Sequence, residues 1–239
     1  MNHSIEYLPG ICVQHITPPL YLKDFGLIAF DMDSTLIDME TVDEIAAAAG
    51  KGAQVAAITK AAMQGKITDY KESLRQRVAL LKGVEVSTLE YIRDIRMQLN
   101  PGAEALVKAA KQAGLKTMVV SGGFTIYTDE LQQRLGLDYS RSNILEIING
   151  KLTGRMVDQE WGDICDGEEK KRMLENTCDA LGISTRQAIA MGDGANDLPM
   201  MGIAGLSVAY HAKPVVQSHA QIAINQGGLD RLLEVVLPG

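Results

Sequence analysis

Cysteine is scarce in this chain, and its three cysteines stand far apart. Cys12, Cys165 and Cys178 form no CxxC pair and are odd in number. The sequence therefore predicts neither a disulfide framework nor a zinc site. Isolated, reduced thiols of this kind are typical of a cytoplasmic protein, and we expect that location.

Positive charge and long apolar runs are also in short supply, which excludes two classes of partner. Lys and Arg total 23 against 30 Asp and Glu, a formal net charge of −7. No basic stripe could follow a phosphate backbone, so no nucleic-acid partner is expected. No stretch approaches the ~20 apolar residues of a membrane span, and the first thirty residues lack the continuous apolar segment of a signal peptide. We therefore expect no membrane partner.

The stretch that organises the rest of the chain runs from Leu27 to Asp38 and reads LIAFDMDSTLID. Its four leading apolar residues, without alternation, indicate a strand buried on both faces, as in a parallel α/β sheet. Asp31 and Asp33 follow at the carboxyl end, where such sheets place their ligands, and would face the same way on an extended chain. Two carboxylates this close repel each other unless a cation lies between them. The pattern predicts a divalent-ion site, preferably for Mg²⁺, although a DxD motif also occurs on solvated loops.

A mainly helical segment separates this strand from the next buried one, Leu115 to Val120. The chain of 239 residues, 46% of them hydrophobic, is long enough for a core with a small second domain. The segment far exceeds the dozen or so residues that a parallel crossover needs. We predict a helical cap over residues 39–100, which acts as a lid beside the site or only packs against the sheet. Its predicted helices run from Thr41 to Ala49, from about Gly52 to Gln64, from Thr68 or Asp69 to Leu81, and from Val86 to Leu99.

The second half of the chain alternates strands with helices. Asn149-Gly150 is a strong hairpin signal, and it joins two predicted strands, 144–148 and 152–157. The alternation predicts a doubly wound (Rossmann-like) parallel-sheet α/β core over residues 25–38 and 101–239, preceded by an extended N-terminal arm over 1–24. The other predicted elements are helices 124–135, 167–181 and 228–236 and strands 188–191, 206–209 and 222–224.

Polar or glycine-rich motifs follow three of the predicted strands. They are DMDST after the first, SGG at residues 121–123 after the second, and GDGAND at residues 192–197 after the third. Parallel strands bring such turns to one edge, so Asp193 should lie near the first two aspartates and complete an acidic cluster suited to Mg²⁺. The Ser121 hydroxyl and the Gly122 N–H are donors of the kind that a phosphate oxygen accepts from. The ordered set of three motifs therefore indicates a metal-assisted phosphate site.

These motifs resemble those of the haloacid dehalogenase superfamily of phosphatases, with DMDST as motif one, SGG as motif two and GDGAND as motif four. The likeness extends from about Leu27 to the C-terminal segment. Two further runs, 40–44 and 73–78, favour the branch that hydrolyses O-phosphoserine. The resemblance implies a Mg²⁺-dependent phosphatase with an α/β core and an inserted helical cap, acting in serine biosynthesis.

The resemblance also implies the roles of the acidic residues. Asp31 would be the nucleophile that becomes an aspartyl phosphate, and a carboxylate is ionised at neutral pH without a base. Asp33 would protonate the leaving alkoxide and then activate the water that hydrolyses the acyl phosphate. Asp31, Asp33 and Asp193 would hold Mg²⁺, Asp33 through its backbone carbonyl. The ion would offset the repulsion between nucleophile and phosphate.

The family needs a lysine that contacts both the phosphate and the nucleophile. Counting back from GDGAND gives Lys170, with Lys171 and Arg172 as alternatives, although such a charged run is often a solvated helix face. Asn196 would bind the phosphate. Asp197 would orient the lysine or a metal-bound water.

The substrate's head group is matched by residues of the predicted cap. Glu40 corresponds to the family residue that meets an ammonium, and a buried acid suits that role, while Arg77 corresponds to the one that binds a carboxylate. Met63 and Tyr70 would supply an apolar wall. Each of these two charged residues could instead have a purely structural role. Glu40 could be a first-turn helix residue favoured by the helix dipole, and Arg77 could be an intrahelical partner of residues 72–73.

Two rival functions remain open from the sequence. The first is a related enzyme that passes the phosphoryl group to another hydroxyl, such as that of homoserine, or that hydrolyses a different small phosphomonoester. The second is a Mg²⁺ or phosphate binding module without catalytic activity. In each case the expected partner is a small molecule, and the protein is expected to be a monomer or a homodimer.

Overall fold

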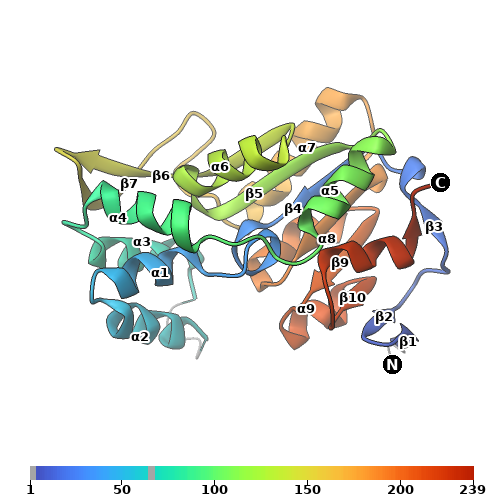
Figure 1. The fold of residues 1–239 in the computed structure, drawn as a ribbon, viewed down its shortest axis with the longest axis horizontal. Coiled ribbons are helices and arrows are strands. Elements are labelled where there is room, and N and C mark those ends of the chain that lie inside the picture. The colour runs from blue at the N-terminus through green and yellow to red at the C-terminus, as the bar shows by residue number, and fades with distance from the viewer. Residues whose placement is uncertain (1–3, 64–67) are drawn as a thin grey trace.

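A mainly parallel sheet forms the centre of the molecule (Figure 1). The computed structural model describes residues 4–63 and 68–239. Within them the sheet order is β1-β2-β10-β9-β8-β4-β5-β6-β7. The strands from β10 to β6 run parallel, whereas β1, β2 and β7 are antiparallel to their neighbours. The strand bounds are β1 Ile5–Leu8, β2 Ile11–Val13, β4 Leu27–Phe30, β5 Lys116–Phe124, β6 Tyr139–Ile148, β7 Lys151–Val157, β8 Ala188–Gly192, β9 Leu206–Tyr210 and β10 Ile222–Ile224.

Strand β4 is buried on both faces, and its side chains alternate between two cores. Ile28 and Phe30 belong to the core that includes residues of α5 (Ala103–Gln112) and α6 (Thr125–Leu135). Leu27 and Ala29 belong to the core that includes residues of α7 (Gly167–Leu181) and α8 (Leu198–Ile203). Successive side chains of a strand point to opposite faces, so helices cover both sides of the sheet. The predicted doubly wound α/β fold is confirmed.

The segment between β4 and α5 is helical and lies to one side of the sheet, below the β6–β7 hairpin in Figure 1. Its helices are α1 Thr41–Ala48, α2 Gly52–Met63, α3 Tyr70–Leu80 and α4 Val86–Tyr91, with a π-helical segment at Ile92–Arg96. The predicted end of the second helix, Gln64, is outside the described residues. The helix predicted to reach Leu99 is too long, because Leu99 pairs with Ile37 in a β-bridge. Asp69 caps α3 by accepting a hydrogen bond from the Lys71 N–H at 2.9 Å.

The β6–β7 hairpin turns at the two residues that the sequence predicts, Asn149 and Gly150. Asn149 and Gly150 have φ values of 51° and 73°, and positive φ at both positions is what a two-residue hairpin turn of type I′ requires. Strand β7 packs against α3, and Glu85 forms a bridge with Lys151. The hairpin therefore contacts the helices that precede α5.

The two ends of the described chain are held by strand pairing. The predicted arm contains β1 and β2, which extend the sheet beside β10, with Ile11 fully buried. The predicted C-terminal helix is wrong in its type and its end: Leu229–Glu234 is a 3₁₀ helix, followed by strand β11 (Val236–Leu237). The chain leaves the helix there because β11 pairs with β3 (Leu20–Tyr21). Helix α9 spans Pro214–His219.

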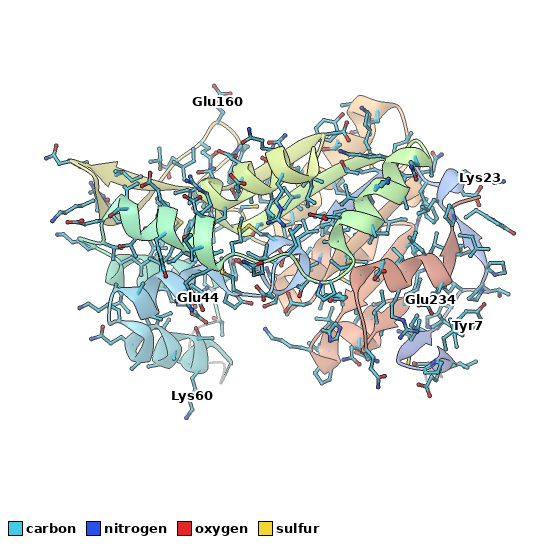
Figure 2. The ribbon with its side chains drawn as sticks, in the orientation of Figure 1. Tyr7, Lys23, Glu44, Lys60, Glu160 and Glu234 are labelled. Carbon is cyan, nitrogen blue, oxygen red and sulfur yellow. The ribbon has the colours of Figure 1, made fainter. Side chains whose placement is uncertain are left out.

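Charged side chains project from the outer surface. Figure 2 shows Lys60 and Glu160 pointing away from the ribbon on opposite sides of the molecule. Among the residues that the structure describes, no helix combines the length and the apolar character that crossing a bilayer requires.

Candidate active site

Three neighbouring strands, β8, β4 and β5, bring their carboxyl ends together. The segment Ser121-Gly122-Gly123 is not a turn after a strand, as predicted, but the last part of β5, which continues to Phe124. Its pairing with β6 shifts register between Val120 and Phe124, and Asn143 of β6 donates to the Gly122 carbonyl at 2.8 Å. This tertiary pairing keeps the glycines extended.

The two aspartates of DMDST lie on different local structures. Asp31 directly follows β4, whereas the chain then turns over Met32–Leu36, where Ser34 has a φ of 56°. Asp33 itself has extended φ and ψ values of −61° and 132°, and the chain turns at Ser34, directly after it. The Asp33 carboxylate accepts hydrogen bonds from the Thr41 N–H at 3.2 Å and from its hydroxyl at 3.1 Å. The first residue of α1 thus orients this carboxylate.

A buried lysine joins the nucleophile candidate to the third motif. Lys170 is 0% exposed, and its Nζ lies 2.7 Å from both Asp31 Oδ1 and Asp197 Oδ1. It lies in the first turn of α7, which Asp166 caps by accepting from the Glu169 N–H at 2.9 Å. Of the three cations that the sequence left open, Lys170 is the one beside Asp31. Lys171 and Arg172 instead face acidic residues of their own helix.

Three carboxylates gather beside this lysine. Oxygen atoms of Asp31, Asp193 and Asp197 all lie within 4.8 Å of one another. Asp197 is held by the N–H groups of Asp193 and Gly194, which reach its Oδ2 at 3.2 and 3.0 Å. With both oxygens of Asp197 engaged, the carboxylates of Asp31 and Asp193 are those best placed to accept a cation.

The electrostatics of the cluster favour a further positive charge. Burial, followed by the charge of Asp197, raises the pKa of Asp31 to about 8, although Lys170 opposes the shift. Burial and the charges of Asp197 and Glu40 raise the pKa of Asp193 to about 7. Carboxylates that are hard to ionise fit a hard divalent cation, which favours their charged form and prefers oxygen ligands.

Asp33 occupies an environment that favours its protonated form. Burial raises the pKa of Asp33 well above its usual value, and the nearby charges of Glu40 and Asp31 raise it further. The hydrogen bonds from Thr41 oppose this shift. A carboxyl group whose pKa is raised in this way is suited to act as a general acid.

The two glycines of SGG leave room for groups from other elements. A Cβ atom at Gly123 would lie 2.5 Å from Met32 Cε and 3.0 Å from Asp33 Oδ2. A Cβ atom at Gly122 would overlap the hydroxyl oxygen of Tyr70. Ser121, which is 1% exposed, accepts a hydrogen bond from the Gly123 N–H at 2.9 Å. A side chain at Gly123 would displace Met32 and crowd Asp33, and one at Gly122 would displace Tyr70.

The side chains predicted to bind the substrate's head group are more exposed to solvent than those of the phosphate site. Glu40 is exposed, not buried as an ammonium-binding acid would be, because it precedes α1 and faces the Ser34 hydroxyl, 2.6 Å from Glu40 Oε1. Arg77 is half-buried, and its Nε donates to the Ser73 carbonyl at 3.4 Å. The charge of Arg77 nevertheless acts on Tyr70, which lies seven residues earlier on the same helix and so on the same helix face.

The last two predicted residues are placed only in part. Asn196 is half-buried in the 3₁₀ turn Ala195–Asp197, with its Oδ1 so close to Gly194 that a Cβ there would overlap it. Met63 ends α2, but its side chain lies outside the described part of the chain.

Sequence reasoning missed two residues that support the site. Thr41 was identified only as the start of a helix, yet it holds Asp33 through two hydrogen bonds. Asn143 is fully buried and joins the Gly122 carbonyl to the Cys165 N–H, which lies 2.8 Å from its Oδ1. The threonine could have been found as a hydroxyl residue at a helix start, whereas no local pattern marks the asparagine.

Comparisons with known proteins agree with this arrangement. A family model described as haloacid dehalogenase-like hydrolase matches residues 25–205. The phosphoserine phosphatase of Polaromonas sp. is 68% identical over 97% of this chain and 98% of its own length. That of Albidiferax ferrireducens is 64% identical over 99% of this chain and 100% of its own length. A solved structure described as a phospho-aspartyl intermediate analogue of phosphoserine phosphatase has a TM-score of 0.81 and 40% identity, covering 89% of this chain and 99% of that one. The resemblance found in the motifs is confirmed, and the chain belongs to the haloacid dehalogenase-like hydrolase family.

Proposed function

We propose that this protein is a Mg²⁺-dependent phosphoserine phosphatase, which converts O-phospho-L-serine and water into L-serine and phosphate in serine biosynthesis. The observation that carries the proposal is the buried Lys170 bridge between Asp31 and Asp197, because it creates a cationic point in an otherwise anionic site. The names of the relatives at 68% and 64% identity support the choice of substrate. The three cysteines are free thiols, which agrees with the cytoplasmic location that we propose.

The donor set of the site fits a divalent cation. We infer that the carboxylates of Asp31 and Asp193, with the backbone carbonyl of Asp33, would hold Mg²⁺. The close approach of the first two carboxylates and their raised pKa values support this assignment. When bound, the ion would neutralise charge between the anionic nucleophile and the phosphate dianion and stabilise the charge that spreads over the phosphoryl oxygens.

The reaction would then proceed in two steps on this chain's own carboxyl groups. Lys170 engages Asp31 Oδ1, which leaves Oδ2 to attack phosphorus. The new bond joins that oxygen to phosphorus, the bond from phosphorus to the serine oxygen breaks, and Asp33 gives its proton to the serine oxygen. Asp33 next takes a proton from water, the water oxygen bonds to phosphorus, and the acyl phosphate breaks to restore Asp31.

The remaining residues would bind the two ends of the substrate. The Ser121 hydroxyl, the Gly122 N–H, Lys170 and Asn196 would surround the phosphoryl oxygens. At the other end we propose Glu40 for the ammonium and Arg77 for the carboxylate, with Met63 and Tyr70 beside them. These head-group contacts come from residues 39–100, which we propose as a cap domain over the core.

A substrate panel tests the proposal. Phosphate release from L-phosphoserine would be measured with and without Mg²⁺, beside phosphothreonine, sugar phosphates and nucleotides. We expect a strong Mg²⁺-dependent preference for phosphoserine. Turnover of other panel members alone would retain the core chemistry and discard the head-group assignment. Products formed on an added acceptor such as homoserine would indicate a phosphotransferase, and inactivity on every compound would favour a binding module.

A further inference from the structure

Tyr70 reaches the phosphate site with its hydroxyl group. It is the first residue of α3, and its side chain is only partly exposed. The hydroxyl oxygen lies so close to Gly122 that a Cβ atom there would overlap it, with the Cys165 carbonyl 3.4 Å from that same Cβ position. The phenol therefore spans from a helix of the proposed cap to strand β5 of the core. Its polar end meets the glycine, which an apolar wall would not require.

The charges that act on this hydroxyl belong to both halves of the proposed substrate site. Burial raises the pKa of Tyr70, Lys170 and Arg77 oppose that shift, and Asp31 adds to it. The group is therefore a neutral O–H donor at physiological pH. In the part of the chain that the structure describes, we find no hydrogen bond from this hydroxyl. By contrast, the hydroxyl of Tyr210, at the end of β9, donates to the Gly227 carbonyl at 3.4 Å.

We propose that the Tyr70 hydroxyl donates a hydrogen bond to a phosphoryl oxygen of the substrate, beside the Gly122 N–H. This inference rests on the proposed function and deepens it. A phosphoryl group offers three strongly accepting oxygens, and a hydrogen bond to a charged acceptor is stronger than one between neutral groups. The donor is carried by the first residue of α3, so the phosphate contacts are complete only while the start of that helix keeps Tyr70 beside Gly122. Tyr70 thereby couples the position of the cap to recognition of the phosphate.

The substitution Tyr70→Phe tests this inference because it keeps the ring and removes only the hydroxyl. We expect kcat/KM to fall about 10- to 100-fold, the range for a lost hydrogen bond to a charged group. The loss should be equal for L-phosphoserine and for phenyl phosphate, because the phosphoryl group is common to both. Tyr91→Phe is the matched control: Tyr91 is 56% exposed on α4 of the same cap, and its variant should retain wild-type kcat/KM.

A binding measurement separates this inference from the choice of substrate. Orthovanadate mimics the phosphoryl group and lacks an amino-acid part, and Tyr70→Phe should bind it at least about 10-fold more weakly in the presence of Mg²⁺. Weaker binding with an unchanged Tm supports the contact even if the wild-type protein fails to hydrolyse phosphoserine. Unchanged vanadate binding and turnover would overturn the inference. A loss confined to phosphoserine would also overturn it, because the hydroxyl would then contact the amino-acid end.

Discussion

Replacing Lys170 by methionine removes a buried ammonium group while keeping an unbranched side chain. The Nζ atom lies 2.7 Å from carboxylate oxygens of both Asp31 and Asp197, and the lysine and Asp197 side chains are fully buried. Removing one partner of a buried ion pair typically costs about 3–5 kcal/mol, because the other charge stays buried without compensation. For a chain of this length, that corresponds to a decrease in Tm of roughly 6–20 °C at pH 8 without metal.

The size of this decrease should depend on pH in a defined direction. The pKa of Asp31 is raised from 3.8 to about 8, so the folded protein binds this proton more tightly than the unfolded chain does. Binding of this proton makes its full contribution to the free energy of unfolding below about pH 4. That contribution is lost as the pH rises through about 8. In Lys170→Met the carboxyl groups can take up protons at pH 5, which removes their mutual repulsion. The difference in Tm from wild type should therefore be smaller at pH 5 than at pH 8.

Thermal unfolding followed by circular dichroism in EDTA, at pH 8 and pH 5, measures this difference. Lys171→Met is the matched control, because the Lys171 Nζ lies 4.0 Å from Glu168 and its side chain is 35% exposed. Its unfolding free energy should stay within about 0.5 kcal/mol of wild type. Equal stability of the two variants, or a decrease for Lys170→Met that is as large at pH 5 as at pH 8, would refute the reasoning.

Three further predictions concern the carboxylates and the cap. Asp31→Asn should abolish turnover while leaving the circular dichroism spectrum unchanged, and surviving activity would exclude Asp31 as the nucleophile. Arg77→Ala should lower kcat/KM for phosphoserine far more than for phenyl phosphate, and equal losses would mean that Arg77 is structural. Burial, Asp197 and Glu40 raise the pKa of Asp193 to about 7, so its stabilising proton is lost as the pH rises through 7. Asp193→Asn should therefore raise the Tm at pH 8 in EDTA and reduce the Tm increase on adding Mg²⁺; an unchanged response to Mg²⁺ would contradict the metal assignment.

The parts of the fold with strong local signals were predictable from the sequence. The run 27–30 is apolar without alternation, and β4 is buried on both faces. Helix α7 has the predicted limits, Gly167–Leu181, since Asp166 caps one end and Gly182 adopts a left-handed conformation at the other. The Asn149-Gly150 turn likewise depends only on the residues within it.

The features that the sequence did not predict depend on partners far along the chain. Strand β2 is defined by pairing with β10, with Ile222 opposite Val13, and neither short segment carries a long pattern of its own. The SGG segment has the composition of a turn but is kept extended by β6 and Asn143. The approach of Tyr70 to Gly122 likewise joins residues 52 positions apart in the sequence. The division into core and cap at residues 39–100 stays a prediction.

The most direct test of the central claim is to identify the residue that carries the phosphoryl group during turnover. Protein turning over L-phosphoserine with Mg²⁺ would be quenched, treated with borohydride, which reduces an acyl phosphate to an alcohol, and analysed by peptide mass spectrometry. We predict homoserine in place of aspartate at position 31, absent without substrate and absent in Asp31→Asn. Phosphate release without any modified residue, or modification at Asp33 instead, would contradict the account.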